Sequence, residues 1–217
     1  MEDFPKVSSF CELESDIEDQ FTVERLHFPK ELGQGGHLNN DIALFRVKTK
    51  GNRDLRFDSH AQPLWLPTPD TAYVPGTNRT ISAMIARAFT SAFSCGIPAF
   101  AIKLQSATVP ISPDETYKAP YVYGPDRIKV GMFCAGLLEG GVDACLGYFG
   151  GGLVCLVDGK PTLMEVISWG FGCERPSRPD VYTRVVHYLP YTLSADFNGS
   201  VQVMLEHKKF LLFLSSS

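Results

Sequence analysis

The sequence has little charge and no strong excess of either sign. Lys and Arg total 20 and Asp and Glu total 24 among 217 residues, so the formal net charge is −4 and charged residues make up only 20%. Ordinary globular domains contain roughly 25% charged residues. Because a protein that neutralises phosphates needs a basic surface, this balance argues against a nucleic-acid partner. Hydrophobic residues make up 44% of the chain, which is enough for a buried core and excludes a disordered acidic tail.

Long apolar runs and metal-ligand spacings are also missing. No run approaches the roughly 18 apolar residues of a membrane helix, so we expect no membrane span. The six cysteines show no Cys-x-x-Cys spacing, and none of the five histidines lies four residues from another. We therefore expect no metal site, and no motif indicates a cofactor. An even number of cysteines is compatible with disulfides, but the count does not fix their pairing.

The two ends of the chain lack recognisable signals. Residues 1–6 have neither the basic nor the apolar region of a secretory signal, so we expect a cytosolic chain or one without its true beginning. Residues 1–17 form an acidic N-terminal segment. At the other end only five consecutive residues are apolar, and we expect 197–217 to be an unattached tail.

What the sequence does contain is a series of short β-type segments separated by turn residues. Nineteen Gly and 15 Pro residues favour turns over long helices. The pattern predicts an all-β protein of antiparallel sandwiches or barrels, with a boundary in the proline-rich stretch 63–75. One short helix is expected at 185–194, shortened or kinked by Pro190. The expected strands are 21–26, 41–47, 80–86, 101–109, 132–136, 152–157, 162–169 and 181–186.

Five motifs in one order give the sequence a family resemblance. They are Asn-Asp-Ile-Ala-Leu (40–44), Met-Phe-Cys-Ala-Gly (132–136), and the segments 142–155, 166–173 and 179–185. Together they resemble the trypsin-like serine proteases of the chymotrypsin fold, the S1 family, from about residue 18 to residue 195. The resemblance implies two antiparallel β-barrels with a cleft between them. A protease domain is therefore expected at 18–196, with 18–75 as the remnant of an incomplete first barrel and 76–196 as the second barrel.

The resemblance implies catalysis by a Ser nucleophile, a His base and an orienting Asp, but only the acid is found. Asp41 matches the triad aspartate, although a turn aspartate before a strand would explain this motif alone. No segment before it resembles the family's histidine motif. Where the family has Gly-Asp-Ser-Gly-Gly, this chain has Gly147, Tyr148 and Phe149 before the two glycines. Phe149 has no oxygen to attack a carbonyl, and loss of the nucleophile costs on the order of 10⁶ in kcat in subtilisin.

Part of the family's substrate cleft is retained. By resemblance, Asp143 is the pocket-base acid that favours Arg and Lys, and Gly147 belongs to the oxyanion loop. The segment Ser168-Trp169-Gly170 matches the strand that pairs with an extended substrate. Asp180 stands where a pocket-wall Gly is usual. Two expectations stay open: the pocket attracts a guanidinium or amidine, or Asp180 fills it.

The cysteines also follow the family in part. Cys145 and Cys173 match a family disulfide. Cys155 and Cys134 match half-cystines whose partner positions hold Arg79 and Tyr117. Cys11 and Cys95 have no counterpart. Glu165 stands where a strand Gly is usual, which places a charge in a half-buried strand. Asn78 and Asn198 begin glycosylation sequons.

Three functions follow from these observations. The first is a catalytically inactive serine-protease homologue that binds a protein or peptide ligand in its cleft, extracellular by resemblance. The second is an active secreted endopeptidase of trypsin type, as the family would suggest. The third is a decayed fragment without a function of its own.

Overall fold

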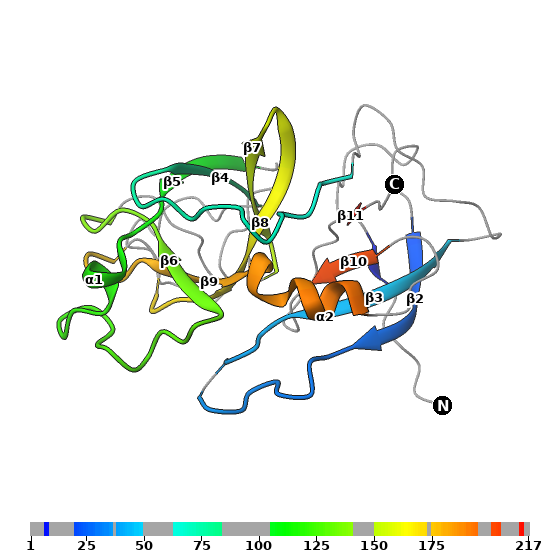
Figure 1. The fold of residues 1–217 in the computed structure, drawn as a ribbon, viewed down its shortest axis with the longest axis horizontal. Helices are drawn as coiled ribbons and strands as arrows, with labels where there is room; N and C mark the ends of the chain where they lie inside the picture. The colour runs from blue at the N-terminus through cyan, green and yellow to red at the C-terminus, as the bar shows by residue number, and fades with distance from the viewer. Residues whose placement is uncertain are drawn as a thin grey trace, which may run out of the picture.

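The computed structural model describes residues 7–8, 20–36, 38–49, 63–83, 105–140, 150–172, 175–194, 201–204 and 213–214. These residues form two antiparallel sheets, one of six strands and one of five. In Figure 1 the six-stranded sheet lies on the left and the five-stranded sheet on the right. The mostly β fold of trypsin type predicted from the sequence is thereby confirmed. No helix in the described part of the chain is long and apolar enough to span a bilayer.

The six-stranded sheet is nearly closed into a barrel, with the order β5-β4-β7-β8-β9-β6. An antiparallel bridge between Ile111 and Ala135 joins the two outer strands, and the Ser112 N–H donates to the Cys134 carbonyl at 3.0 Å. Leu153 and Leu163 are fully buried. The strands are β4 (Asn78–Ala83), β5 (Gln105–Pro110), β6 (Met132–Ala135), β7 (Gly152–Val157), β8 (Lys160–Trp169) and β9 (Asp180–Arg184).

The five-stranded sheet has the order β1-β2-β3-β10-β11. Its central strand has two fully buried residues, Leu44 and Phe45. Residues 201–204 pair with β3 and residues 213–214 pair with 201–202, so the segment expected to be an unattached tail contributes two strands. The strands are β1 (Val7–Ser8), β2 (Gln20–His27), β3 (Ala43–Thr49), β10 (Val201–Met204) and β11 (Phe213–Leu214).

The expected C-terminal helix is present in two parts. A 3-10 turn, η1 (Val185–Tyr188), leads into the α-helix α2 (Leu189–Ser194). Pro190 is the second residue of α2, where the first turn needs no intrahelical N–H, so it is accommodated at the change of helix type. A further short helix, α1 (Asp114–Tyr117), was not predicted. All eight expected strands overlap observed strands, and 84–86 and 101–104 lie outside the described residues.

Candidate functional site

Asp41 is held at the end of a loop that closes on itself. Asn40 has a left-handed backbone with φ of 56°, a conformation that asparagine tolerates better than most residues. Its side-chain amide donates to the Glu31 carbonyl at 2.8 Å and its Oδ1 accepts from the Tyr188 hydroxyl at 3.1 Å. Burial raises the pKa of Tyr188 to about 12, and the negative charge of Asp41 acts in the same direction. These contacts of Asn40 therefore fix the position of the next residue, Asp41, at the end of the loop.

The Asp41 side chain reaches across to the six-stranded barrel. Its Oδ2 accepts a hydrogen bond from the Ser168 hydroxyl at 2.6 Å, and its main-chain oxygen accepts one from the Thr183 hydroxyl at 2.8 Å. Asp41 is only 6% exposed and Ser168 only 5%. The structure thus brings together two residues that the sequence motifs singled out, one beside each sheet.

Gly170 and Asp180 form a second contact between sequence-predicted residues. Asp180 is the first residue of β9 and is 2% exposed. Its Oδ1 lies so close to Gly170 that a Cβ atom on that glycine would overlap it. The Asp180 carboxylate therefore lies directly against the backbone of the segment 168–170, and only glycine fits opposite it.

Aromatic rings pack against the second residue of that segment, Trp169. The Trp169 ring packs edge-on against Tyr123 with centroids 5.4 Å apart and against Phe171 with centroids 5.6 Å apart. The Arg127 guanidinium lies over the Phe171 ring at 5.1 Å and that of Arg178 lies over Tyr123 at 5.8 Å. The sequence motif 166–173 included Trp169 and Phe171 but gave no sign of Tyr123, Arg127 or Arg178, because these three lie in other segments of the chain.

The remaining predicted site residues lie outside the described part of the chain. They are Asp143, Cys145, Gly147, Phe149 and Cys173. The two family positions that lost a cystine partner are described, and both Cys134 and Cys155 are free thiols. Tyr117, at the partner position of Cys134, belongs to the same buried cluster as that cysteine. Among the described residues, no group of three or more His, Cys, Asp or Glu side chains could hold a metal ion.

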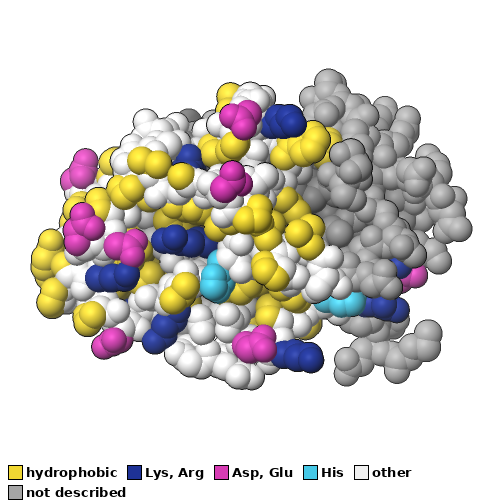
Figure 2. Space-filling model, viewed as in Figure 1, with side chains coloured by type: hydrophobic (Ala, Val, Ile, Leu, Met, Phe, Trp, Pro, Cys, Tyr) yellow, Lys and Arg dark blue, Asp and Glu magenta, His cyan; other side chains and the backbone are white. Residues whose placement is uncertain are grey.

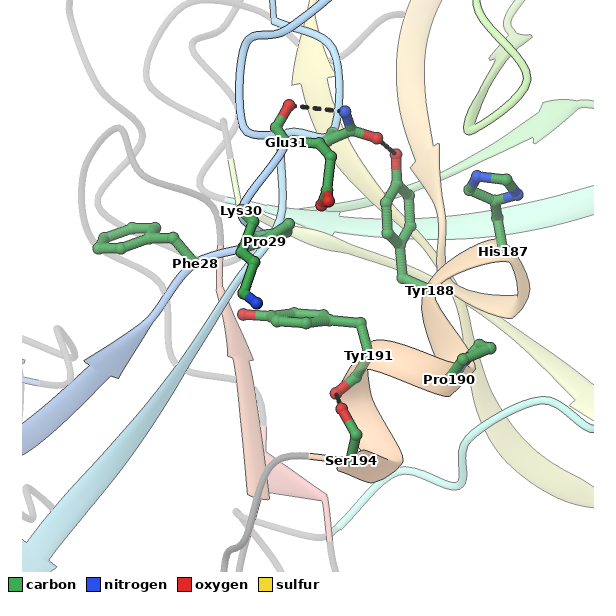
Figure 3. Close-up of a pocket in the computed structure, with 10 residues that line it drawn as sticks. Phe28, Pro29, Lys30, Glu31, His187, Tyr188, Pro190, Tyr191 and Ser194 are labelled. Carbon is green, nitrogen blue, oxygen red and sulfur yellow. Dashed lines mark hydrogen bonds between the residues drawn. The ribbon is translucent and has the colours of Figure 1, made fainter.

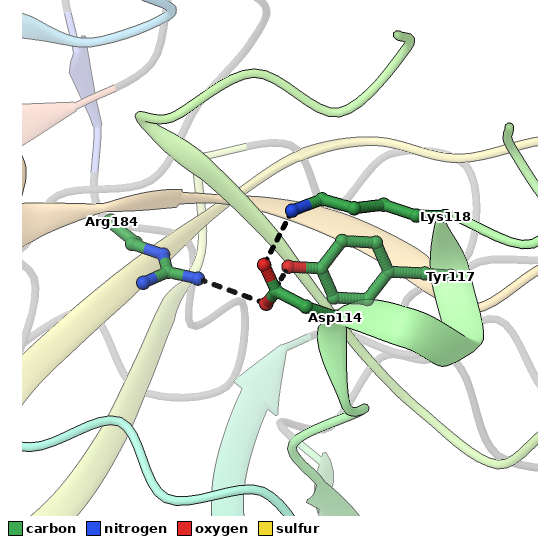
Figure 4. A network of polar contacts seen from close by, with 4 residues as sticks. All are labelled: Asp114, Tyr117, Lys118 and Arg184. Carbon is green, nitrogen blue, oxygen red and sulfur yellow. Dashed lines mark hydrogen bonds and ion pairs between the residues drawn. The ribbon is translucent and has the colours of Figure 1, made fainter. Parts of the chain in front are cut away.

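Tyr117 also belongs to a polar network at the end of the barrel (Figure 4). Its hydroxyl donates to Asp114, the Lys118 amine lies 2.6 Å from Asp114 Oδ2, and an Arg184 nitrogen lies 3.8 Å from Asp114 Oδ1. Partial burial opposes ionisation of Asp114, but the hydrogen bonds from Lys118 and Tyr117 and the two positive charges lower its pKa. The network connects α1 with β9 through Asp114 and Arg184. It lies beside Tyr117, which by resemblance occupies the position of the cystine partner of Cys134.

One open groove lies outside the predicted site. It has a volume of about 580 Å³ and runs between the loop 28–31 and the helical segment 187–194. Figure 3 shows Lys30 and Tyr191 facing each other across it, with Glu31 beside Tyr188. Sequence analysis did not find this groove. Basic and acidic side chains are interspersed over the described part of the face drawn in Figure 2.

Comparison with known proteins agrees with this geometry. The family described as Trypsin matches residues 8–192. The chain belongs to the trypsin family of serine proteases. It is 34% identical over 178 residues to the hepatocyte growth factor activator serine protease of Mus musculus, which covers 82% of this chain and 26% of that protein.

Two further relatives show the same pattern. Coagulation factor XII of Rattus norvegicus is 39% identical over 155 residues, which is 70% of this chain and 25% of that protein. Putative trypsin-6 of Homo sapiens is 36% identical over 154 residues, which is 71% of this chain and 55% of that protein. The chain thus spans about a quarter of the length of the first relatives that it matches.

Proposed function

We propose that this chain is a catalytically inactive member of the trypsin family that binds a protein or peptide ligand along the segment Ser168 to Gly170. The observation that carries the proposal is the hydrogen bond from Ser168 to Asp41, because it preserves the acid side of a triad in a sequence without the other two members. The role of that acid is to hold and stabilise an imidazole. The histidine motif is missing before Asp41, and Phe149 stands at the nucleophile position.

The ligand chemistry that the cleft favours is cationic. Asp180 supplies a carboxylate against Gly170, and the resemblance places Asp143 at the base of the same pocket. The Asp180 carboxylate also occupies space beside Gly170, so we expect an Arg or Lys side chain to bind weakly. We also propose that the protein works outside the cell, on the strength of its family membership.

Labelling of the purified full chain with an active-site probe tests whether the protein is catalytically inactive. A fluorophosphonate probe, which reacts with activated serines, should leave the protein unlabelled, and an arginine ester should not be hydrolysed. Trypsin treated in parallel is the positive control. Labelling that a trypsin inhibitor abolishes would show an active endopeptidase, the alternative that the family membership favours.

A decayed fragment is the other alternative, and a melting curve separates it from a binding module. The barrel core is well buried, with Phe133, Leu153 and Met164 fully inaccessible. A folded module should therefore be monodisperse and melt in one cooperative transition. A product that aggregates and shows no transition would support decay.

A further inference from the structure

Two residues at positions where this sequence departs from its family lie side by side in the barrel interior. The Nε of Arg79 on β4 is 3.8 Å from Oε1 of Glu165 on β8, with the two side chains 6% and 0% exposed. That distance is beyond a direct hydrogen bond. Neither carboxylate oxygen of Glu165, nor the Arg79 Nε, has a hydrogen-bond partner among the described residues. The contact is therefore an ion pair only when Glu165 is ionised, and a cation at this distance without a hydrogen bond offsets the cost of a buried carboxylate only in part.

Strand register explains how these residues meet. β7 lies between β4 and β8, with Thr80 opposite Val154 and Leu153 opposite Glu165. One step further along the antiparallel ladder of β4 and β7, Arg79 comes opposite Cys155. Arg79 therefore stands at the position from which a cystine would join Cys155, and its longer side chain crosses β7 to reach the next strand. The contact links β4 with β8 where the family has a covalent link between β4 and β7.

Among the described residues, four ionisable groups from different segments interact electrostatically with Glu165. Arg79 comes from β4, Cys155 from β7 and Arg184 from β9, directly opposite Glu165 in the strand register. Tyr73 comes from the segment before β4 and donates to the Met164 carbonyl at 2.7 Å. The Arg184 guanidinium lies over the Tyr73 ring at 5.0 Å.

Burial is the largest influence on the Glu165 carboxyl, and the two arginines only partly offset it. Burial raises its pKa while the charges of Arg79 and then Arg184 lower it, and together they move the pKa from 4.5 to about 8. The folded chain thus holds a proton on this carboxyl at pH values where the unfolded chain has released it. Stability from this group is fully present below about pH 4.5 and is lost as the pH rises through about 8.

We propose that Glu165 is a pH-sensitive site in the barrel core: it is buried beside Arg79 as a neutral carboxyl, and the fold weakens as Glu165 ionises because Arg79 offsets the buried charge only in part. This inference goes beyond the proposed function and does not depend on it. Its effect extends to the candidate site, since β8 contains Ser168 and leads directly into Gly170, and β9 contains both Arg184 and Asp180.

Equilibrium unfolding of the full-length chain between pH 5 and pH 9.5 tests whether ionisation of Glu165 weakens the fold. A Cys155→Ser background removes the neighbouring thiol, so that its ionisation cannot contribute to the measured pH dependence. The unfolding equilibrium constant should rise by up to about tenfold per pH unit between about pH 5 and pH 8, relative to the same chain with Glu165→Gln. The matched control is Glu115→Gln, an exposed position on α1, which should keep the full pH dependence. Parallel curves for the background and the Glu165→Gln variant would overturn the proposal.

Infrared titration of the parent chain covers the case in which Glu165→Gln does not fold. A protonated carboxyl band should persist at pH 6.5, where exposed carboxyls are ionised, and disappear by pH 9.5. Arg79→Met should move the midpoint of that band upward, because it removes the cation that favours ionisation. Absence of a protonated carboxyl at pH 6.5, or an unchanged midpoint in Arg79→Met, would overturn the proposal.

Discussion

Ser168 donates a 2.6 Å hydrogen bond to Oδ2 of Asp41, a residue 127 positions earlier in the chain. The bond joins the loop between β2 and β3 of the five-stranded sheet to the C-terminal end of strand β8 in the barrel. A charge-assisted bond between two side chains that are nearly inaccessible is stronger than an exposed one. We therefore expect the bond to stabilise the folded chain.

Ser168→Ala should therefore destabilise the fold without any change in turnover. It removes a donor from a buried carboxylate, which costs about 1–3 kcal/mol. The expected loss can be measured by chemical denaturation at neutral pH. Ser194→Ala is the matched control, because that exposed hydroxyl bonds only to the local Tyr191 carbonyl. A loss for Ser168→Ala no greater than that for Ser194→Ala would contradict a structural role.

Gly170→Ala should also destabilise the chain, because its new methyl group would overlap the Asp180 carboxylate. Overpacking of a buried site costs about 1–3 kcal/mol. The double variant Gly170→Ala with Asp180→Gly removes the obstacle, so the cost of the alanine should be largely relieved. Additive losses in this double-mutant cycle would show that the two side chains do not compete for one space.

Benzamidine binding separates the two roles of Asp180. If the carboxylate fills the pocket, calorimetry should detect no binding to the parent chain, and Asp180→Gly should gain it. Asp180→Asn is the matched control, because it keeps the volume without the charge and should stay closed. If the parent chain binds benzamidine at millimolar concentration and Asp180→Asn loses that binding, Asp180 is the cation ligand instead.

The features that could be predicted from the sequence are those that depend on neighbouring residues in the chain. The strands around Leu44 and Leu153 could be predicted, because short apolar runs bounded by turn residues are short-range signals. The pairing of Asp41 with Ser168 was not predicted, because the resemblance assigned each residue to the site separately. The motifs alone did not give the hydrogen bond or its length.

Features that depend on register could not be predicted. Arg79 and Glu165 each departed from the family pattern, but nothing in the sequence said that they meet, since their contact crosses an intervening strand. β10 was assigned to a tail because chain ends without a long apolar run are usually not attached to a core. Its pairing with β3 is a long-range contact that local propensity does not encode.

The two described thiols should differ sharply in reactivity. Cys134 is 0% exposed, and burial raises its pKa well above the ordinary value, with the charge of Asp180 acting in the same direction. Cys155 is half-buried, and burial raises its pKa although the charge of Arg79 opposes this. Because the exposed thiolate is the reactive form, iodoacetamide should modify Cys155 in the native state and reach Cys134 only after unfolding. Peptide mapping by mass spectrometry, with and without denaturant, measures both rates in one sample. Equal native rates at the two residues would show that the barrel around Cys134 opens readily, which would contradict a fold that is stable without its family disulfides.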